Sequence, residues 1–142
     1  ATELGTASII PVQTRNNNAE RIRQDRLQAH ALEAAEQCGA TFVPEVADIL
    51  PLDRVLSDWP PGRKLLWCDE AMAGQAPALA GARGEPWAIL IGPEGGFSAD
   101  EQARLRRLPW VVPLALGPRI LRADTAAVAA LTLWQVALGD WA

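Results

Sequence analysis

Two glycine-containing loops hold the residue types best suited to binding a ligand. The first is segment 89–98, ILIGPEGGFS, and the second is segment 116–125, LGPRILRADT. In each, an apolar run typical of a buried strand stops at Gly-Pro, and a helix-like pattern begins a few residues later. Because ligands of open α/β sheets bind at such strand ends, the two loops are the candidate site.

The glycines of the first loop indicate close approach of the backbone to a ligand. Gly92, Gly95 and Gly96 can expose consecutive amide groups, although a tight turn without a ligand is the alternative explanation of the glycine pair alone. The spacing matches neither a Walker loop, which needs a following lysine, nor the GxGxxG fingerprint. Glu94 would repel a phosphate, so the loop suits a ligand whose reacting part is cationic or neutral.

The second loop admits a structural and a functional interpretation. Gly117-Pro118-Arg119 is typical of a turn, and Arg122 precedes the start of a helix. Asp124 and Thr125 are residue types that ordinarily open helices, as a carboxylate near the N-terminus and a hydroxyl N-cap. Only the presence of both loops in one chain favours a functional site.

Composition sets the limits of the protein class. With 142 residues and 49% hydrophobic content, we expect one domain, and no apolar run reaches the roughly 20 residues that span a bilayer. The absence of a signal pattern predicts a soluble, cytoplasmic protein with no membrane partner, in which Cys38 and Cys68 are reduced thiols. A net charge of −4 argues against a protein that coats nucleic acid, yet twelve arginines accompany the single Lys64, and Arg119 and Arg122 lie in the second loop.

The hydrophobic pattern predicts alternating strands and helices. Strands are expected at 7–12, 42–46, 64–68, 87–91 and 111–116, and helices at 19–38, 52–56, 98–108 and 124–138. Ser98 and Glu101 match a capping box, Gly39 and Gly139 are placed to close helices, and 73–84 is expected to be a loop. This order predicts an α/β fold with a mostly parallel sheet, helices on both faces and 87–91 as a central strand.

The remaining residues with possible chemical roles are better explained by packing. His30, the only histidine, has no partner for a Ser/His/Asp site and is expected at the surface or in a packing role. We expect Trp87, Trp110 and Trp134 in the core, and Trp59 and Trp141 exposed or at a dimer contact.

Together with EAAEQCG at 33–39 and LGD at 138–140, the two loops resemble the ribosomal small-subunit (16S) RNA uridine N3-methyltransferases, a family of the SPOUT superfamily of knotted methyltransferases. The resemblance covers essentially the whole chain, and one departure is Asp124, where the family more often has glutamate. Members of the family also carry a PUA-like RNA-binding domain ahead of the methyltransferase domain. We therefore expect residues 1–142 to be a methyltransferase domain without that N-terminal domain.

The resemblance implies a fold, a cofactor and partners. The C-terminal segment would form a trefoil knot, the protein would be a homodimer, and its substrate would be small-subunit ribosomal RNA or the assembled small subunit. The cofactor would be S-adenosyl-L-methionine, with no metal. By resemblance, the cofactor-binding residues would be Cys68, Asp69, Ile91, Gly92, Pro93, Glu94, Gly95, Gly96, Leu116, Gly117, Ile120, Leu121, Arg122 and Thr125.

The implied reaction assigns roles to three side chains. Uridine N3 becomes a nucleophile only when its imide proton leaves, so the site must stabilise an anionic base, and Arg122 is the expected electrostatic residue. Glu94 or Asp124 could accept the proton, although a structural role is favoured for Asp124. Two other functions stay open, namely a module that only dimerises and docks on the ribosome, and a phosphate-binding nucleotide domain.

Overall fold

The computed structural model describes residues 1–17 and 22–142, which form two compact units, Ala1–Asp58 and Trp59–Ala142. Each unit has its own internal packing, and the expectation of one domain from chain length stays a prediction. The first contains a 3-10 turn at Thr2–Leu4, β1 (Ser8–Ile9), β2 (Val12–Gln13), α1 (Gln24–Cys38), β3 (Glu45–Val46), β4 (Leu50–Pro51) and α2 (Leu52–Ser57). The second contains β5 (Lys64–Cys68), a 3-10 turn at Glu70–Met72, β6 (Trp87–Leu90), α3 (Ala99–Arg107), β7 (Val111–Leu114) and α4 (Ala123–Ala137).

The strands of the first unit form short parallel pairs, β1 with β3 and β2 with β4. The strand expected at 7–12 is divided, because Pro11, which lacks an N–H donor, lies between β1 and β2. The strand expected at 42–46 is reduced to β3, whose position is fixed by a side chain of α1. Gln28 donates to the Pro44 carbonyl at 3.0 Å and accepts from the Val46 N–H at 2.8 Å.

Helix α1 begins at Gln24, and the expected start at Ala19 lies outside the described residues. Its end is as predicted, because Gly39 adopts the left-handed conformation with φ 72°. His30 is exposed on this helix. None of the helices in the described residues is both long enough and apolar enough to cross a membrane.

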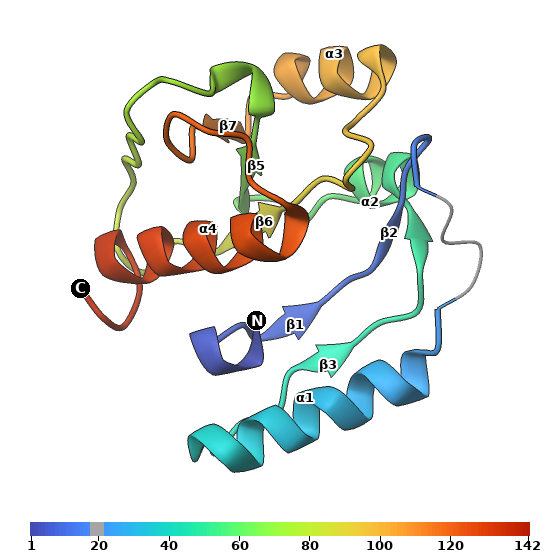
Figure 1. Cartoon of the computed structure of the whole chain (residues 1–142), viewed down its shortest axis with the longest axis vertical. Helices are drawn as coiled ribbons and strands as arrows, with labels where there is room; N and C mark the ends of the chain where they lie inside the picture. The colour runs from blue at the N-terminus through green and yellow to red at the C-terminus, as the bar shows by residue number, and fades with distance from the viewer. Residues whose placement is uncertain (18–21) are drawn as a thin grey trace. The chain divides into compact units, whose positions relative to one another are not determined.

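Three parallel strands form the sheet of the second unit, in the order β6-β5-β7 (Figure 1). The prediction that 87–91 is a central strand is wrong for the described residues, since β6 lies at an edge and β5 is in the middle. Burial explains this position: Leu65, Leu66 and Trp67 are consecutive and at most 3% exposed, which is typical of a parallel strand covered on both faces. The α/β class and the parallel pairing are confirmed, but the described strands form three small sheets instead of one.

The register places the carboxyl ends of all three strands at one edge. Trp67 of β5 pairs with Leu90 of β6, and Cys68 pairs with Leu114 of β7. The segments that follow these strands therefore leave the sheet on the same side. They include both glycine loops and the segment that begins at Asp69.

One end of each of the two remaining helices, α3 and α4, was predicted from the sequence. Ser98 caps α3 through a complete capping box, in which its hydroxyl accepts from the Glu101 N–H at 3.2 Å and Glu101 accepts from the Ser98 N–H at 2.8 Å. Gly139 follows the C-cap residue Leu138, as expected for a residue that closes α4, and its N–H donates to the Trp134 and Gln135 carbonyls at 3.1 and 3.2 Å, although it has no positive φ. A Cβ at Gly139 would lie 2.8 Å from the Cα of Gln135, so close packing is what requires glycine there.

The tryptophans are distributed differently from the prediction. Trp67 is the buried one, at 1% exposure, while the expected core residues Trp87, Trp110 and Trp134 are half-buried. Trp110 stacks on Trp59 with ring centroids 4.7 Å apart and an interplanar angle of 1°. Trp141 is exposed, as expected.

The capping box predicts the effect of a hydroxyl deletion on stability. Ser98→Ala leaves the Glu101 N–H without its acceptor and lowers the free energy of unfolding by about 1 kcal/mol. Ser98→Thr keeps the hydroxyl and is the control, with stability close to that of the original chain. Chemical denaturation measures both, and equal stability of Ser98→Ala and Ser98→Thr would contradict the capping role.

Candidate active site

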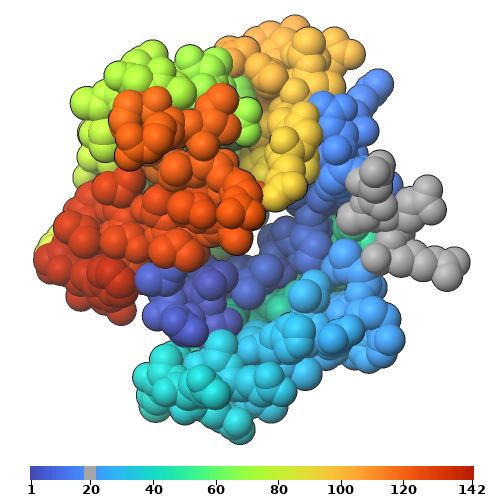
Figure 2. All heavy atoms as spheres, in the orientation of Figure 1, coloured from blue at the N-terminus to red at the C-terminus, as the bar shows by residue number. Residues whose placement is uncertain are grey.

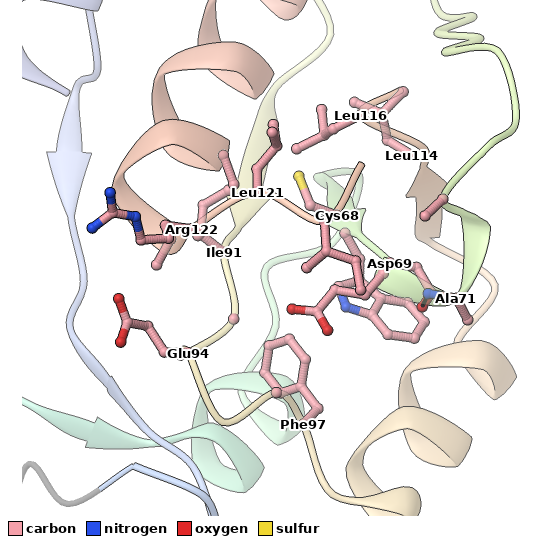
Figure 3. Close-up of a pocket in the computed structure, with 18 of the residues that line it drawn as sticks. Cys68, Asp69, Ala71, Ile91, Glu94, Phe97, Leu114, Leu116, Leu121 and Arg122 are labelled. Carbon is pink, nitrogen blue, oxygen red and sulfur yellow. Dashed lines mark hydrogen bonds between the residues drawn. The ribbon is translucent and has the colours of Figure 1, made fainter. Parts of the chain in front are cut away.

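Three loops at the carboxyl edge of the β6-β5-β7 sheet enclose a pocket of about 700 Å³ (Figure 3). The loops are 69–73 after β5, 91–97 after β6 and 116–122 after β7. Figure 3 shows Glu94 and Arg122 toward one side of the pocket, and Asp69 and Ala71 toward the other. All residues that line it belong to the second unit.

The structure brings most of the sequence-predicted site residues together. Of the predicted set, the pocket is lined by Cys68, Asp69, Ile91, Gly92, Pro93, Glu94, Gly96, Leu116, Gly117, Ile120, Leu121 and Arg122. Gly95, Asp124 and Thr125 are not among the lining residues. Asp124 and Thr125 are exposed in the first turn of α4, where the Asp124 carboxylate accepts the Thr125 N–H at 2.8 Å.

Further lining residues were not predicted from the sequence. They are Trp67, Glu70, Ala71, Ala73, Phe97, Leu114, Arg119, Ala123 and Ala126, with Gln102 from α3. Most of them lie next to predicted residues along the chain, so extending each loop by one or two positions would have found them. Gln102 lies inside a helix, and no sequence signal marks it.

In loop 91–97, Gly92 leaves room for an aromatic ring to pack against the backbone. A Cβ at Gly92 would lie 2.8 Å from Cε2 of Phe97, which is closer than carbon atoms normally approach. Phe97 is 8% exposed and meets Trp67 in an edge-to-face contact with ring centroids 6.2 Å apart. Gly96 has a φ of 67°, and its N–H donates to the Pro93 carbonyl at 2.8 Å, which closes the turn.

Backbone hydrogen bonds join the segment after β5 to the segment after β7. The Asp69 N–H donates to the Leu114 carbonyl at 3.2 Å, and the Gly74 N–H donates to the Gly117 carbonyl at 3.0 Å. Gly117 has a φ of 98°, a conformation that L side chains rarely adopt. In Figure 2, the segment after β7, coloured orange, lies at the surface against the green segment that follows β5.

The pocket combines apolar walls with charges of both signs. Leu114, Leu116 and Leu121 contribute apolar surface, and Ile120 is 68% exposed beside them. Three carboxylates (Asp69, Glu70 and Glu94) and two guanidinium groups (Arg119 and Arg122) also line the cavity. Such a lining suits an amphiphilic ligand that carries both a cationic and an anionic group.

Among the charged residues that line the pocket, Asp69 is the buried one, at 8% exposure. Its Oδ1 accepts the Ala71 N–H at 3.0 Å, and its Oδ2 forms an ion pair with Nη2 of Arg106 at 2.8 Å. A buried carboxylate needs such partners, because removing it from water without them is costly. Asp69 is therefore held in one orientation at the wall of the pocket.

Cys68 presents a neutral thiol to the pocket. Burial raises the pKa of the Cys68 thiol to about 12, because desolvation disfavours the thiolate. Cys38 and Cys68 are both free thiols, as predicted, and Cys38 is exposed. A protonated Cys68 is a poor nucleophile and contributes mainly packing.

The fold and pocket define an α/β protein with a cavity suited to a small ligand at the carboxyl ends of parallel strands. Residues 1–135 match the family model of the RNA methyltransferase domain. The chain therefore belongs to this family, which confirms the family identified from the two loops and segments 33–39 and 138–140.

Curated relatives and solved structures agree with this membership. The chain is 30% identical to the ribosomal RNA small subunit methyltransferase E of Rickettsia conorii, over 92% of this chain and 54% of that protein. It is 31% identical to the Bacillus subtilis protein of the same name, over 92% of this chain and 56% of that protein. The chain thus spans about half the length of these relatives.

Two structures solved with S-adenosylmethionine share the fold. One is the ribosomal RNA small subunit methyltransferase E of Neisseria gonorrhoeae, with a TM-score of 0.80 and 28% identity over 99% of this chain and 59% of that one. The other, from Legionella pneumophila, has a TM-score of 0.81 and 32% identity over 96% of this chain and 57% of that one.

The environment of Cys68 predicts slow alkylation. At about pH 8, a pKa near 12 leaves roughly one thiol in ten thousand as thiolate, so Cys68 reacts with iodoacetamide far more slowly than Cys38. Mass spectrometry of Cys38→Ser against Cys68→Ser measures the two rates. Denaturant should make the rates converge, and fast labelling of folded Cys38→Ser would contradict a desolvated, neutral Cys68 thiol.

Proposed function

We propose that this chain is the methyltransferase domain of an enzyme that uses S-adenosylmethionine to methylate N3 of a uridine in small-subunit ribosomal RNA. The observation that carries the proposal is that loops 69–73, 91–97 and 116–122 together line one pocket. Membership of the RNA methyltransferase domain family supports the reaction class, and the names of the relatives support the substrate.

The residues of the pocket fit the proposed cofactor. A volume of about 700 Å³ lies within the usual range for pockets that enclose molecules of this size. The apolar wall of Leu114, Leu116 and Leu121 suits an adenine ring, with backbone groups of the third loop as hydrogen-bonding partners. The carboxylates suit the sulfonium and ammonium groups, and Arg119 or Arg122 suits the carboxylate.

When bound, the cofactor supplies an electrophilic methyl group. Arg122 would stabilise the negative charge that develops on the uracil oxygens as the N3 proton leaves. Arg122 is exposed at the pocket, where its backbone carbonyl accepts the Ala126 N–H at 2.8 Å as the N-cap of α4. The helix thereby fixes the backbone while the side chain stays accessible to RNA.

Glu94 is the better candidate of the two carboxylates for accepting the N3 proton. It is exposed, lines the pocket and lies toward the same side as Arg122 in Figure 3. Asp124 is outside the lining, and its carboxylate already accepts a hydrogen bond from the first turn of α4. We therefore propose that Asp124 stabilises the start of α4.

The proposal includes the assembly that the family resemblance implies. The protein would act as a cytoplasmic homodimer with a C-terminal trefoil knot, on ribosomal RNA or the assembled small subunit. Exposed apolar side chains of α4, namely Val128 and Val136, and the exposed Trp141 support burial of this region against a second copy.

Calorimetry with S-adenosylmethionine tests the cofactor site. The chain should bind S-adenosylmethionine. Gly117→Val should weaken binding by about tenfold or more, because a branched side chain is strained at a φ of 98° and would displace loop 116–122. Gly84→Val is the matched control, since Gly84 has a φ of 83° in a loop outside the pocket. Gly84→Val should lower the stability of the chain but leave its Kd for S-adenosylmethionine unchanged.

A second experiment tests the catalytic roles. Small ribosomal subunits are treated with labelled methyl donor and the full-length protein that contains this chain, and N3-methyluridine is measured by nucleoside mass spectrometry. Arg122→Ala should lower the rate by about a hundredfold, Glu94→Gln by less, and Asp124→Asn least. Equal, small losses for all three variants would contradict the assigned roles.

The two alternative functions give different results. A module that only dimerises and docks on the ribosome would bind RNA without any heat from the methyl donor. A phosphate-binding domain would bind ATP tightly in competition with the methyl donor. The three carboxylates at the pocket argue against the phosphate ligand, because they would repel it.

A further inference from the structure

Helix α3 connects two of the pocket loops through side chains one turn apart. Gln102 donates through Nε2 to the Phe97 carbonyl at 2.9 Å, which holds the end of the loop after β6. Arg106 pairs with Asp69 in the loop after β5, and its Nη2 also lies 3.5 Å from Oε1 of Gln102. Residues four apart lie on the same face of a helix, so this face carries both connections.

Arg106 also contacts the aromatic floor of the pocket. Its guanidinium carbon lies 5.2 Å from the centroid of the Trp67 ring, within the range of a cation–π contact. Trp67 in turn meets Phe97 edge to face. One arginine thus touches both the strand that ends at the pocket and the carboxylate that follows it.

The two partners of the ion pair differ in burial. The Asp69 side chain is 7% exposed, whereas that of Arg106 is 47% exposed. Arg106 therefore keeps part of its hydration, while Asp69 depends on Arg106 and the Ala71 N–H for compensation of its charge. Without the guanidinium, the carboxylate would have to turn toward solvent, and loop 69–73 would move with it.

We propose that Arg106 is a positioning residue for the cofactor site: through Asp69 and Trp67 it holds loop 69–73 in the conformation that binds the ligand. The proposal rests on the proposed function, in which S-adenosylmethionine occupies this pocket. Arg106 itself does not line the cavity, so it acts on the ligand through Asp69.

Calorimetry of the 142-residue chain with S-adenosylmethionine tests the proposal. Arg106→Met keeps an unbranched side chain over Trp67 but removes the charge, and it should raise the Kd about tenfold. Arg106→Lys retains a cation and should restore most of the affinity. Arg107→Met is the matched control, because Arg107 is the next, exposed residue of α3 and does not line the pocket, and its Kd should be unchanged.

A double-mutant cycle with Asp69→Asn separates positioning from general destabilisation. The double variant Asp69→Asn with Arg106→Met should bind no more weakly than the weaker single variant, because both changes break the same contact. Circular dichroism at the assay temperature establishes that each variant is folded. If Arg106→Met unfolds, Arg106→Gln takes its place in the cycle.

The outcomes distinguish this proposal from the proposed function. Absence of binding by the unaltered chain would overturn the cofactor site itself. Binding by the unaltered chain with equal Kd values for Arg106→Met and Arg107→Met would overturn the positioning role alone. The positioning role would also be overturned if the affinity losses of Asp69→Asn and Arg106→Met multiply in the double variant. The same holds if Arg106→Lys recovers none of the affinity.

Discussion

The parallel pairing of β5 with both β6 and β7 is the constraint on which the candidate site depends. Parallel strands end at a common edge, so segments that are far apart in the sequence leave the sheet side by side. Here the pairing brings together the segment after Cys68, the loop after Leu90 and the loop after Leu114. The consecutive buried residues of β5 stabilise this arrangement, because a central strand must be apolar on both faces.

Given that edge, different interactions hold each loop in place. Gly92 admits the Phe97 ring, and Gly117 adopts a left-handed backbone whose carbonyl accepts the Gly74 N–H. Asp69 is held by its backbone N–H, by Ala71 and by Arg106. The pocket is therefore formed mainly by backbone geometry and one buried charge, which leaves the exposed Glu94 and Arg122 side chains free to serve the proposed chemistry.

Local signals made a substantial part of this structure predictable. The strand 64–68 has the predicted bounds, and the Ser98 capping box and the Gly39 helix end form as expected, because each depends on residues a few positions apart. The two loops were likewise recognisable from glycines that follow apolar runs. Predictions failed where a distant neighbour decides the outcome. The strand at 87–91, expected in the middle of the sheet, lies at its edge because β5 pairs with both β6 and β7.

The sequence by itself determined the family, the approximate positions of the helices and strands, and most residues of the candidate pocket. Only the tertiary structure decided that β5 lies between β6 and β7, that Gln102 reaches the pocket, and that Asp124 and Thr125 do not line it. The pairing of Arg106 with Asp69 joins residues 37 positions apart, and no periodicity or motif encodes it. Local backbone preferences act over a few residues, whereas the choice of partners for a strand or a buried charge depends on the free energy of packing the whole unit.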